Sequence, residues 1–486
     1  MTIKLQTATP FLFIDICEVI RLFWPEAQIS ETEGDVLMVH EHAEVSGQLI
    51  EKWSMDGVTQ THCAVAAHGR VGRYGDLLAK RHVKRAVKTG CFLLMREVTG
   101  KQPPWGSLTG IRPTRLLYEA YEAGMSQREA EKWLEEDFFV SEDRTRLLSQ
   151  ILSMQRGLIY PEKAQFDLYI GIPFCVTRCA YCSFSSGTLG DGRLTEPYIA
   201  ALMREIDGCA EMTKRMGLRV RAAYMGGGTP TSLSADQLGR VLDRAMARFP
   251  GAVEWTVEAG RPDTIDREKL AALCARGVGR ISVNPQTFSD ETLKVIGRAH
   301  TSEDTRRAYA LAREMGFADI NMDLIAALPG ETMGDFERTL SEAVRLAPES
   351  ITVHSLAIKR SSKLHELGYR QPDTEQAQQM VDLARGYLMA AGYNPYYLYR
   401  QKYMAGNLEN VGYAKPGRAC LYNIGNMEET AKVLALGAGA ITKWLFPAER
   451  RIERAANVKN IEAYIERVDE MLARKRALLI REDEEK

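Results

Sequence analysis

The sequence predicts an α/β protein in which a parallel sheet, curled into a full or partial barrel, follows an N-terminal α+β domain and precedes a C-terminal α+β extension. Two observations carry the prediction. Six short apolar runs alternate with amphipathic stretches between residues 166 and 356, and each run leads to a glycine or polar motif. Strands that alternate with helices are typical of βαβ units and therefore of parallel sheets. The length of 486 residues agrees with about three domains of roughly 150 residues each.

Residues 1–160 are predicted to form the N-terminal α+β domain, of unknown role. Alternating apolar and polar residues indicate a small sheet over 36–40 and 44–53. A basic stretch, 73–91, is helix-like. Helical periodicity predicts three more helices, over 115–123, 126–138 and 141–158.

Residues 161–365 are predicted to form the barrel. Its strands are expected at 166–172, 221–225, 254–257, 280–283, 319–326 and 351–356. Its helices are expected at 198–216, 234–248, 266–276, 304–315 and 332–346. Residues 366–486 are predicted to form a C-terminal region that covers the substrate, with an extended aromatic segment (393–400), a loop (413–420), a small-residue turn (436–441) and a terminal helix (461–479).

Composition and charge exclude several classes of protein. The chain has 45% hydrophobic and 26% charged residues, which rules out a mostly disordered protein. The net charge of −1 argues against bulk binding of nucleic acid or of an anionic membrane. No apolar run reaches the roughly 18 residues of a membrane span, and the first residues lack a signal-peptide core. We therefore expect a cytoplasmic protein with no membrane span and no nucleic-acid partner.

Three of the nine cysteines, Cys175, Cys179 and Cys182, form a C-x3-C-x2-C motif after the first expected barrel strand. Three thiolates on one tight loop can bind three irons of a 4Fe-4S cluster, which leaves the fourth iron open for S-adenosylmethionine (SAM). One-electron reduction of SAM then releases a radical that abstracts hydrogen. The alternatives are a structural zinc site or unrelated buried cysteines. Zinc requires a fourth ligand nearby, and the nearest cysteine, Cys209, lies on a predicted helix.

Chemically distinctive residues follow every expected barrel strand, and in such barrels the reactive groups collect at the C-terminal strand ends. The second strand leads to the sequence GGGTPT at 226–231, where glycines allow the backbone to approach a ligand. An ordinary tight turn is the alternative for this segment. The other strand ends carry Glu258, Asn284 with Gln286, Asp323, and His354 with Lys359 and Arg360.

The motifs together resemble a known family. The motifs are IPFCxxxCxYCxF at 172–184, GGGTPT, RISVxxQTF at 280–288, GRAH at 297–300 and NMDLIxxLPGET at 321–332. They resemble the radical SAM oxygen-independent coproporphyrinogen III oxidases over residues 166–445. The segment WGSLTGIRPT at 105–114 and the long N-terminal region resemble the HemZ branch of that family. The resemblance implies a radical SAM partial (β/α)6 barrel of the TIM type.

The resemblance also implies roles for single residues. Cys175, Cys179 and Cys182 would ligate the cluster. One SAM, or two side by side, would be bound by Tyr169, Tyr181, Gly227, Gly228, Thr229, Glu258, Gln286, Arg298, Asp323, Ala357 and Ile441.

Structural roles are the alternative for some of these residues. Glu258 and Asp323 could be helix caps or ion-pair partners, Arg298 a surface arginine and Ile441 plain core. Two positions depart from the oxidase pattern: Gly171 replaces a histidine, and Phe184 replaces a further cysteine. The second departure also resembles the heme-chaperone branch.

The resemblance implies that the protein decarboxylates two propionates of coproporphyrinogen III to vinyl groups and so forms protoporphyrinogen IX in heme biosynthesis. Its partners would be a tetrapyrrole substrate and a reductase, flavodoxin or ferredoxin as electron donor. A heme-binding chaperone of the HemW type is the second hypothesis. A tRNA-modifying radical SAM enzyme ranks third, because the charge is near neutral and no RNA-binding module is evident.

A tetracarboxylate substrate requires cations, and the candidates are Lys359, Arg360, Arg400, Lys402 and Arg418. Each is also a candidate for a solvated or ion-paired side chain. His300 and His354 could line a porphyrin pocket, but a hydrogen-bonded structural histidine is the more common role. Cys420 is expected to be structural.

Overall fold

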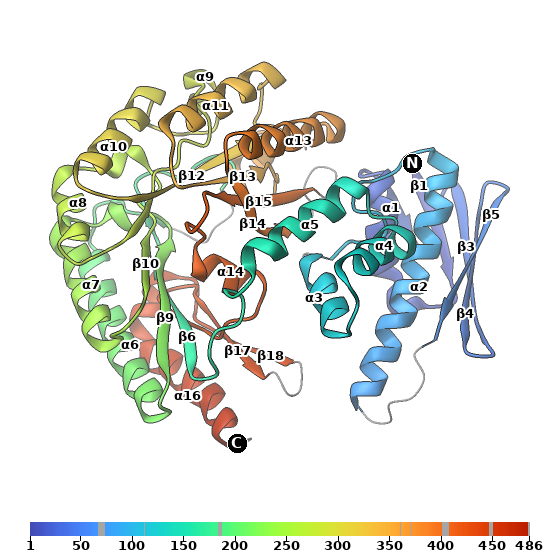
Figure 1. Ribbon diagram of the computed structural model, residues 1–486, viewed down its shortest axis with the longest axis horizontal. Coiled ribbons are helices and arrows are strands. Elements are labelled where there is room, and N and C mark those ends of the chain that lie inside the picture. Colours follow the sequence, from blue (N-terminus) through green and yellow to red (C-terminus); the bar gives the residue numbers. More distant parts are fainter. Residues whose placement is uncertain are drawn as a thin grey trace. The chain divides into compact units, whose positions relative to one another are not determined.

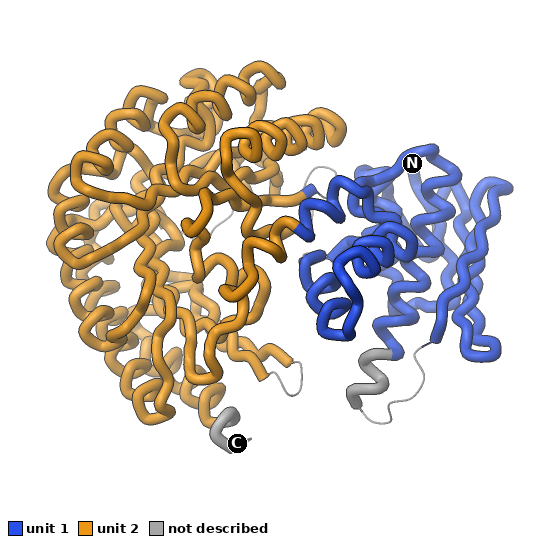
Figure 2. The backbone as a smooth tube through the Cα atoms, viewed as in Figure 1, with its two compact units in different colours: residues 1–149, 406–408 blue, residues 150–405, 409–486 orange. Residues whose placement is uncertain are grey.

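The computed structural model describes residues 1–66, 73–110, 112–182, 187–359, 361–370, 372–400, 408–446 and 451–484. It divides into two compact units, which Figure 2 shows in different colours. Unit 1 comprises residues 1–149 and 406–408, and unit 2 comprises 150–405 and 409–486. The barrel and nearly all of the C-terminal region therefore share one unit.

Unit 1 contains a five-stranded sheet in the order β2-β1-β3-β4-β5. The alternating runs expected at 36–40 and 44–53 form one hairpin. A turn at Ser46 and Gly47, with φ of 51° and 78°, interrupts the second run, because two successive positive φ angles match the tight turn of a twisted hairpin. The strands are β1 (Thr2–Thr7), β2 (Gln28–Ser30), β3 (Val36–Val45), β4 (Gln48–Met55) and β5 (Val58–Val65).

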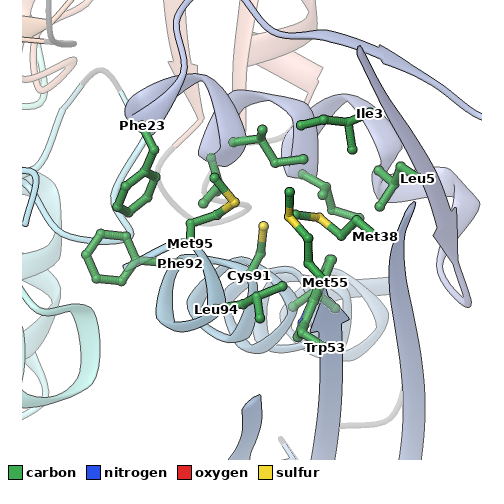
Figure 3. Packing of buried hydrophobic residues seen from close by; sticks show 14 of the residues in the cluster. Ile3, Leu5, Phe23, Met38, Trp53, Met55, Cys91, Phe92, Leu94 and Met95 are labelled. Carbon is green, nitrogen blue, oxygen red and sulfur yellow. The ribbon is translucent and has the colours of Figure 1, made fainter. Parts of the chain in front are cut away.

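The helices expected in this part of the chain are confirmed, with small changes at their ends. They are α2 (Arg73–Thr99), α3 (Thr114–Glu122), α4 (Gln127–Phe138) and α5 (Glu142–Gln155). We did not predict α1 (Phe13–Phe23), whose buried residues recur every three or four positions. Figure 3 shows the core of unit 1, where Phe23 of α1 lies 5.4 Å from Phe92 of α2 (ring centroids) and Cys91 packs among methionines.

Unit 2 is built on an eleven-stranded sheet in the order β14-β15-β13-β12-β11-β10-β9-β6-β16-β17-β18. Its centre is the parallel series that we expected, with α6, α7, α8, α10 and α11 along its outer face (Figure 1). The six strands are β6 (Gln165–Ile172), β9 (Arg219–Gly227), β10 (Glu254–Val257), β11 (Arg280–Ser282), β12 (Asp319–Ala326) and β13 (Ser350–Ser355). The outer helices are α6 (Thr195–Arg215), α7 (Ala235–Arg248), α8 (Arg267–Cys274), α10 (Ser302–Glu314) and α11 (Met333–Leu346), and the short α9 (Asp290–Val295) precedes α10.

Strands from the C-terminal region extend the parallel series at both edges. β16 (Val433–Leu436) pairs parallel with β6 and is followed by antiparallel β17 (Ile441–Phe446) and β18 (Arg451–Ala456). At the other edge, β15 (Glu409–Ala414) pairs antiparallel with β13, and β14 (Asn394–Arg400) pairs with β15. Within the described part of the chain, the edge strands β14 and β18 do not pair with each other, so the barrel is partial, as the fold class predicted.

The C-terminal region differs from our expectation in several elements, among them the unpredicted strands β16, β17 and β18. Residues 413–414, expected in a loop, end strand β15, because Tyr413 and Ala414 complete its ladder with β13. Helix α13 (Thr374–Ala390) was not predicted. The remaining helices are α12 (Lys363–Glu366), α14 (Leu421–Met427), α15 (Ile461–Glu466) and α16 (Val468–Glu484). None of the helices among the described residues has both the length and the apolar character needed to cross a membrane.

Candidate active site at the C-terminal strand ends

A cavity of about 430 Å³ lies at the C-terminal ends of the barrel strands. Parallel strands end at the same edge of a sheet, so residues far apart in the sequence meet there. The structure brings ten of the eleven predicted SAM-binding residues and all three cysteines to this cavity: Tyr169, Tyr181, Gly227, Gly228, Thr229, Glu258, Gln286, Arg298, Asp323 and Ala357 with Cys175, Cys179 and Cys182. Ile441, on β17, is 43% exposed and is not part of the lining.

The cysteine loop leaves β6 and is held in place by main-chain hydrogen bonds. Its first residues, β7 (Phe174–Cys175), pair with β8 (Gly187–Thr188). The Cys182 amide donates to the Cys179 carbonyl at 3.1 Å, which closes a tight turn. The Ala180 amide donates to the carbonyl of Ile296, so the loop is attached to the segment before Arg298.

The donor set of the loop fits an iron–sulfur cluster. All three cysteines are free thiols of intermediate exposure that face the cavity. Among the described residues, no three His, Cys, Asp or Glu side chains converge closely enough to share a single metal ion. Three soft thiolates around a cavity of this size instead match the ligand requirement of a 4Fe-4S cluster.

The glycine-rich segment after β9 packs against the start of the cysteine loop. The amides of Gly228 and Thr229 donate to the carbonyls of Ile172 and Phe174, both at 2.7 Å. A Cβ atom on Gly228 would lie 2.5 Å from the Phe174 oxygen, so only glycine fits there. Because these amides bond to the protein itself, the segment can offer a ligand carbonyl oxygens, which accept hydrogen bonds from an ammonium group.

Glu258 lies beside this segment, where the Tyr224 hydroxyl donates to its carboxylate at 2.6 Å. Burial, reinforced by the nearby charge of Asp323, raises the pKa of Glu258 to about 7. The group is therefore a hydrogen-bonded carboxyl inside the cavity, and it caps none of the described helices.

Asp323 accepts hydrogen bonds from the side-chain amides of Asn284 and Asn321, at 2.7 and 2.8 Å. Burial alone would raise its pKa, but His354 and hydrogen bonds from Asn321 and Thr352 hold the pKa of Asp323 below its ordinary value. His354 Nε2 lies 3.9 Å from the Asp323 carboxylate and Nδ1 lies 3.4 Å from the Tyr399 hydroxyl. Asp323 thus supplies a fixed negative charge to the wall of the cavity.

Gln286 and Arg298 have special backbone or side-chain environments. Gln286 is buried with φ of 68°, a conformation that is rare for residues other than glycine and that clusters at functional sites. Arg298 is also buried and is therefore not a surface arginine. Its guanidinium donates to the Tyr181 hydroxyl at 3.3 Å and to the Gly260 carbonyl at 3.5 Å.

Several residues of the site were missed in the sequence. Tyr224 stacks on Tyr422 with ring centroids 4.7 Å apart, and the Tyr169 ring lies nearly parallel to both, with its centroid 6.4 Å from that of Tyr224 and 6.2 Å from that of Tyr422. Tyr422 is not part of the cavity lining; it packs against the lining residues Tyr169 and Tyr224 and comes from α14, so no local motif connected it with the barrel. Asn284 was noted only as a strand end, and Arg261 was passed over beside Glu258. The other missed lining residues include Arg178, Asn321, Tyr397, Tyr399 and Asn410.

The candidate substrate cations divide into two groups. Lys359 lines the cavity, and so does His354, which was considered as a pocket histidine and not as a substrate cation. Arg400 is buried away from its lining, and the Arg418 carbonyl accepts a hydrogen bond from Arg280 at the start of β11. Cys420 is buried and donates to Glu254 at 3.2 Å. Phe184, Arg360 and Lys402 lie outside the described residues.

Comparisons with known proteins show the family of the chain. Residues 169–343 match the model of the radical SAM superfamily. The chain is 37% identical to the oxygen-independent coproporphyrinogen-III oxidase-like protein HemZ of Bacillus subtilis over 469 residues, 93% of this chain and 92% of that protein. The chain belongs to this oxidase-like family. The cofactors of this radical SAM family are a 4Fe-4S cluster and SAM.

Other relatives of the family are also similar to the chain. The heme chaperone HemW of Escherichia coli is 31% identical over 302 residues, 62% of this chain and 75% of that protein. The solved structure of the coproporphyrinogen III oxidase HemN of E. coli matches with a TM-score of 0.53 and 25% identity, over 66% of this chain and 72% of that one.

Proposed function

We propose that this protein is an oxygen-independent coproporphyrinogen III dehydrogenase, which converts propionate side chains of the substrate to vinyl groups and so forms protoporphyrinogen IX. The observation that carries the proposal is the cavity, in which a three-cysteine loop meets polar residues from the ends of the barrel strands. The family relatives named for coproporphyrinogen oxidation support the choice of substrate.

Cys175, Cys179 and Cys182 would hold the 4Fe-4S cluster. The ten predicted residues that line the cavity would hold SAM, and Ile441 remains a prediction without a place in the lining. When bound, the two cofactors supply one electron and a 5′-deoxyadenosyl radical that takes a hydrogen atom from the propionate β-carbon. The propionate then loses carbon dioxide and one electron, which passes to an external acceptor, and a vinyl group remains.

Charged side chains of the cavity would bind and orient SAM and the substrate. Glu258, held by Tyr224, would accept hydrogen bonds from the ammonium group of SAM, and Arg298 would pair with its carboxylate. Lys359 and Arg178 are cations of the lining and would bind the substrate carboxylates, and the His354 imidazole also lines the cavity. Strands β14 and β15 would cover the substrate, since Tyr397, Tyr399 and Asn410 come from this C-terminal region.

The test is a turnover assay under strict anaerobiosis. The reconstituted protein, SAM, dithionite, an electron acceptor and coproporphyrinogen III should yield mono- and divinyl products and 5′-deoxyadenosine. A Cys175→Ser variant should yield neither. The control is Cys274→Ser, which replaces a cysteine away from the cavity and should retain turnover. Absence of vinyl product from cluster-loaded wild-type protein would refute the proposed substrate. The natural electron donor that replaces dithionite would be a reductase, flavodoxin or ferredoxin.

A second candidate function is heme binding and delivery. The similarity to the chaperone HemW supports it, as do Tyr397, Tyr399 and His354, which offer aromatic surface and an imidazole inside the cavity. Titration of the loaded protein with heme separates the two functions. A stoichiometric heme spectrum that His354→Ala removes, without turnover of coproporphyrinogen III, would favour the chaperone.

A further inference from the structure

The loop after β10 places a buried arginine, Arg261, beside the cysteine motif. The guanidinium side chain is only 4% exposed and lines the same cavity as the cysteines. Arg261 is the N-cap residue of the short 3-10 turn Pro262–Thr264, which follows β10 and contains Asp263. A buried guanidinium must have its donors satisfied, so its partners show what it holds.

One edge of this guanidinium points toward the cysteine loop. Nη1 donates to the Thr177 carbonyl at 3.0 Å and to Cys179 Sγ at 3.7 Å. A single nitrogen thus contacts both the backbone of the loop and one of its three thiols. Hydrogen bonds from a charged donor are stronger than those from a neutral group.

Another edge of the guanidinium pairs with a carboxylate. Nε and Nη2 donate to the two Asp263 oxygens at 3.2 and 2.9 Å, a bidentate pair that fixes the plane of the guanidinium. Burial alone would raise the pKa of Asp263, but His300 and Arg261 hold it well below its ordinary value. His300 is buried, and its Nδ1 lies 3.7 Å from Asp263. The carboxylate stays ionised, so the anchor is permanent near neutral pH.

The environments of two of the cysteines differ. Cys175 Sγ lies 3.5 Å from the neutral hydroxyl of Thr229. Cys179 receives Arg261 directly, and Arg298 adds a second positive charge nearby: burial alone would lower the pKa of Arg298, but Tyr181 and Cys179 raise it. Two positively charged side chains therefore lie near Cys179.

We propose that Arg261 is a positioning residue that tunes the cluster: its contact with Cys179 stabilises the reduced state, and its contact with Thr177 holds the loop in shape. Reduction adds an electron to the cluster, and hydrogen bonds to the ligating sulfur disperse the added negative charge, which raises the reduction potential. The inference rests on the cluster of the proposed function, but it does not depend on the substrate.

A purely structural role for Arg261 predicts a different result, and the chain provides a matched control. Arg280 is also a buried arginine with a bidentate carboxylate, because it donates to the two Asp319 oxygens at 2.9 and 2.8 Å. It lies at the start of β11, at the opposite ends of the strands from the cysteine loop, and does not line the cavity. Replacement of either arginine breaks the ion pair of a buried guanidinium, but of these two only Arg261 contacts a cysteine of the loop.

The test uses the full chain reconstituted with iron and sulfide, as wild type, Arg261→Lys, Arg261→Gln and Arg280→Lys. Dithionite titration followed by electron paramagnetic resonance measures the one-electron potential of the cluster, and iron content and melting temperature are measured in parallel. We expect a more negative potential in Arg261→Lys and a larger negative shift in Arg261→Gln. Arg280→Lys should lower the melting temperature and leave the potential unchanged.

Each outcome decides the inference. Wild-type potential in a cluster-loaded Arg261→Gln, or an equal shift in Arg280→Lys, would overturn it. If the glutamine variant does not fold, the lysine variant decides alone by the same criterion. A wild-type protein that binds no iron would overturn the cluster assignment and this inference together, whereas a loaded protein without coproporphyrinogen turnover contradicts only the proposed substrate.

Discussion

Glu258 is a carboxyl group buried beside Tyr224 and the glycine-rich segment, and its burial raises its pKa to about 7 from the usual 4.5. The folded protein therefore binds a proton that the unfolded chain has lost between these two pH values. Stability from this group is fully present below about pH 4.5 and is lost as the pH rises through about 7.

This linkage predicts the effect of Glu258→Gln on the cofactor-free protein. The amide is neutral at every pH and can still accept the hydrogen bond from Tyr224. We expect the variant to equal the wild type in free energy of unfolding near pH 4.5 and to exceed it by about 2 kcal/mol at pH 8. Urea unfolding between pH 4.5 and 8.5 measures the difference, with exposed Glu268→Gln as the control. A difference that does not change with pH would contradict the prediction.

At the scale of elements, the glycine-rich segment after β9 packs closely against the cysteine loop after β6. The space is closed by backbone atoms, since a Cβ on Gly228 would meet the oxygens of Phe174 and Ile172 at 2.5 and 2.9 Å. Backbone cannot move aside as a flexible side chain can. The position of the cysteine loop therefore depends on the absence of one side chain.

Gly228→Ala should displace the cysteine loop. We expect it to destabilise unit 2 by roughly 2 kcal/mol, as overpacking of a tight site does, and to lower the iron bound on reconstitution at least severalfold. The matched control is Gly386→Ala in helix α13, where a Cβ meets nothing within 4 Å and should stabilise the helix by up to about 1 kcal/mol. Melting temperature and iron content measure both variants. Normal iron content in Gly228→Ala would disprove this account.

Strand β16 shows which kind of element a local sequence pattern misses. The barrel strands were predicted closely because each is a short apolar run beside an amphipathic helix; β10 and β12 have the predicted bounds. β16 is the short buried sequence VLAL, which became a strand because β6 offered it an unpaired edge. Such a partner, 266 residues away in the sequence, has no signature in the segment itself.

At the scale of the whole molecule, two compact units have separate hydrophobic cores. We predict that Phe92→Ala, which empties the core of unit 1, lowers the melting temperature of one calorimetric transition by several degrees and leaves a second transition unchanged. The loss for a buried phenylalanine is about 3–5 kcal/mol. Leu293→Ala in unit 2 is the reciprocal control. Differential scanning calorimetry that shows both transitions shifted together by Phe92→Ala would contradict independent cores.

The sequence by itself determined the class of the barrel, the cysteine loop and the ends of the strands, because these depend on periodicity and on residue types at short spacing. Ten of the eleven residues that it predicted to bind SAM line one cavity, since parallel strands bring their ends to one edge. Only the tertiary structure revealed which other residues contact the predicted site residues. Arg261 beside Cys179, Tyr422 behind Tyr224 and Tyr399 beside His354 join residues that are 45 to 198 positions apart in the sequence, and such contacts depend on packing that no local pattern encodes.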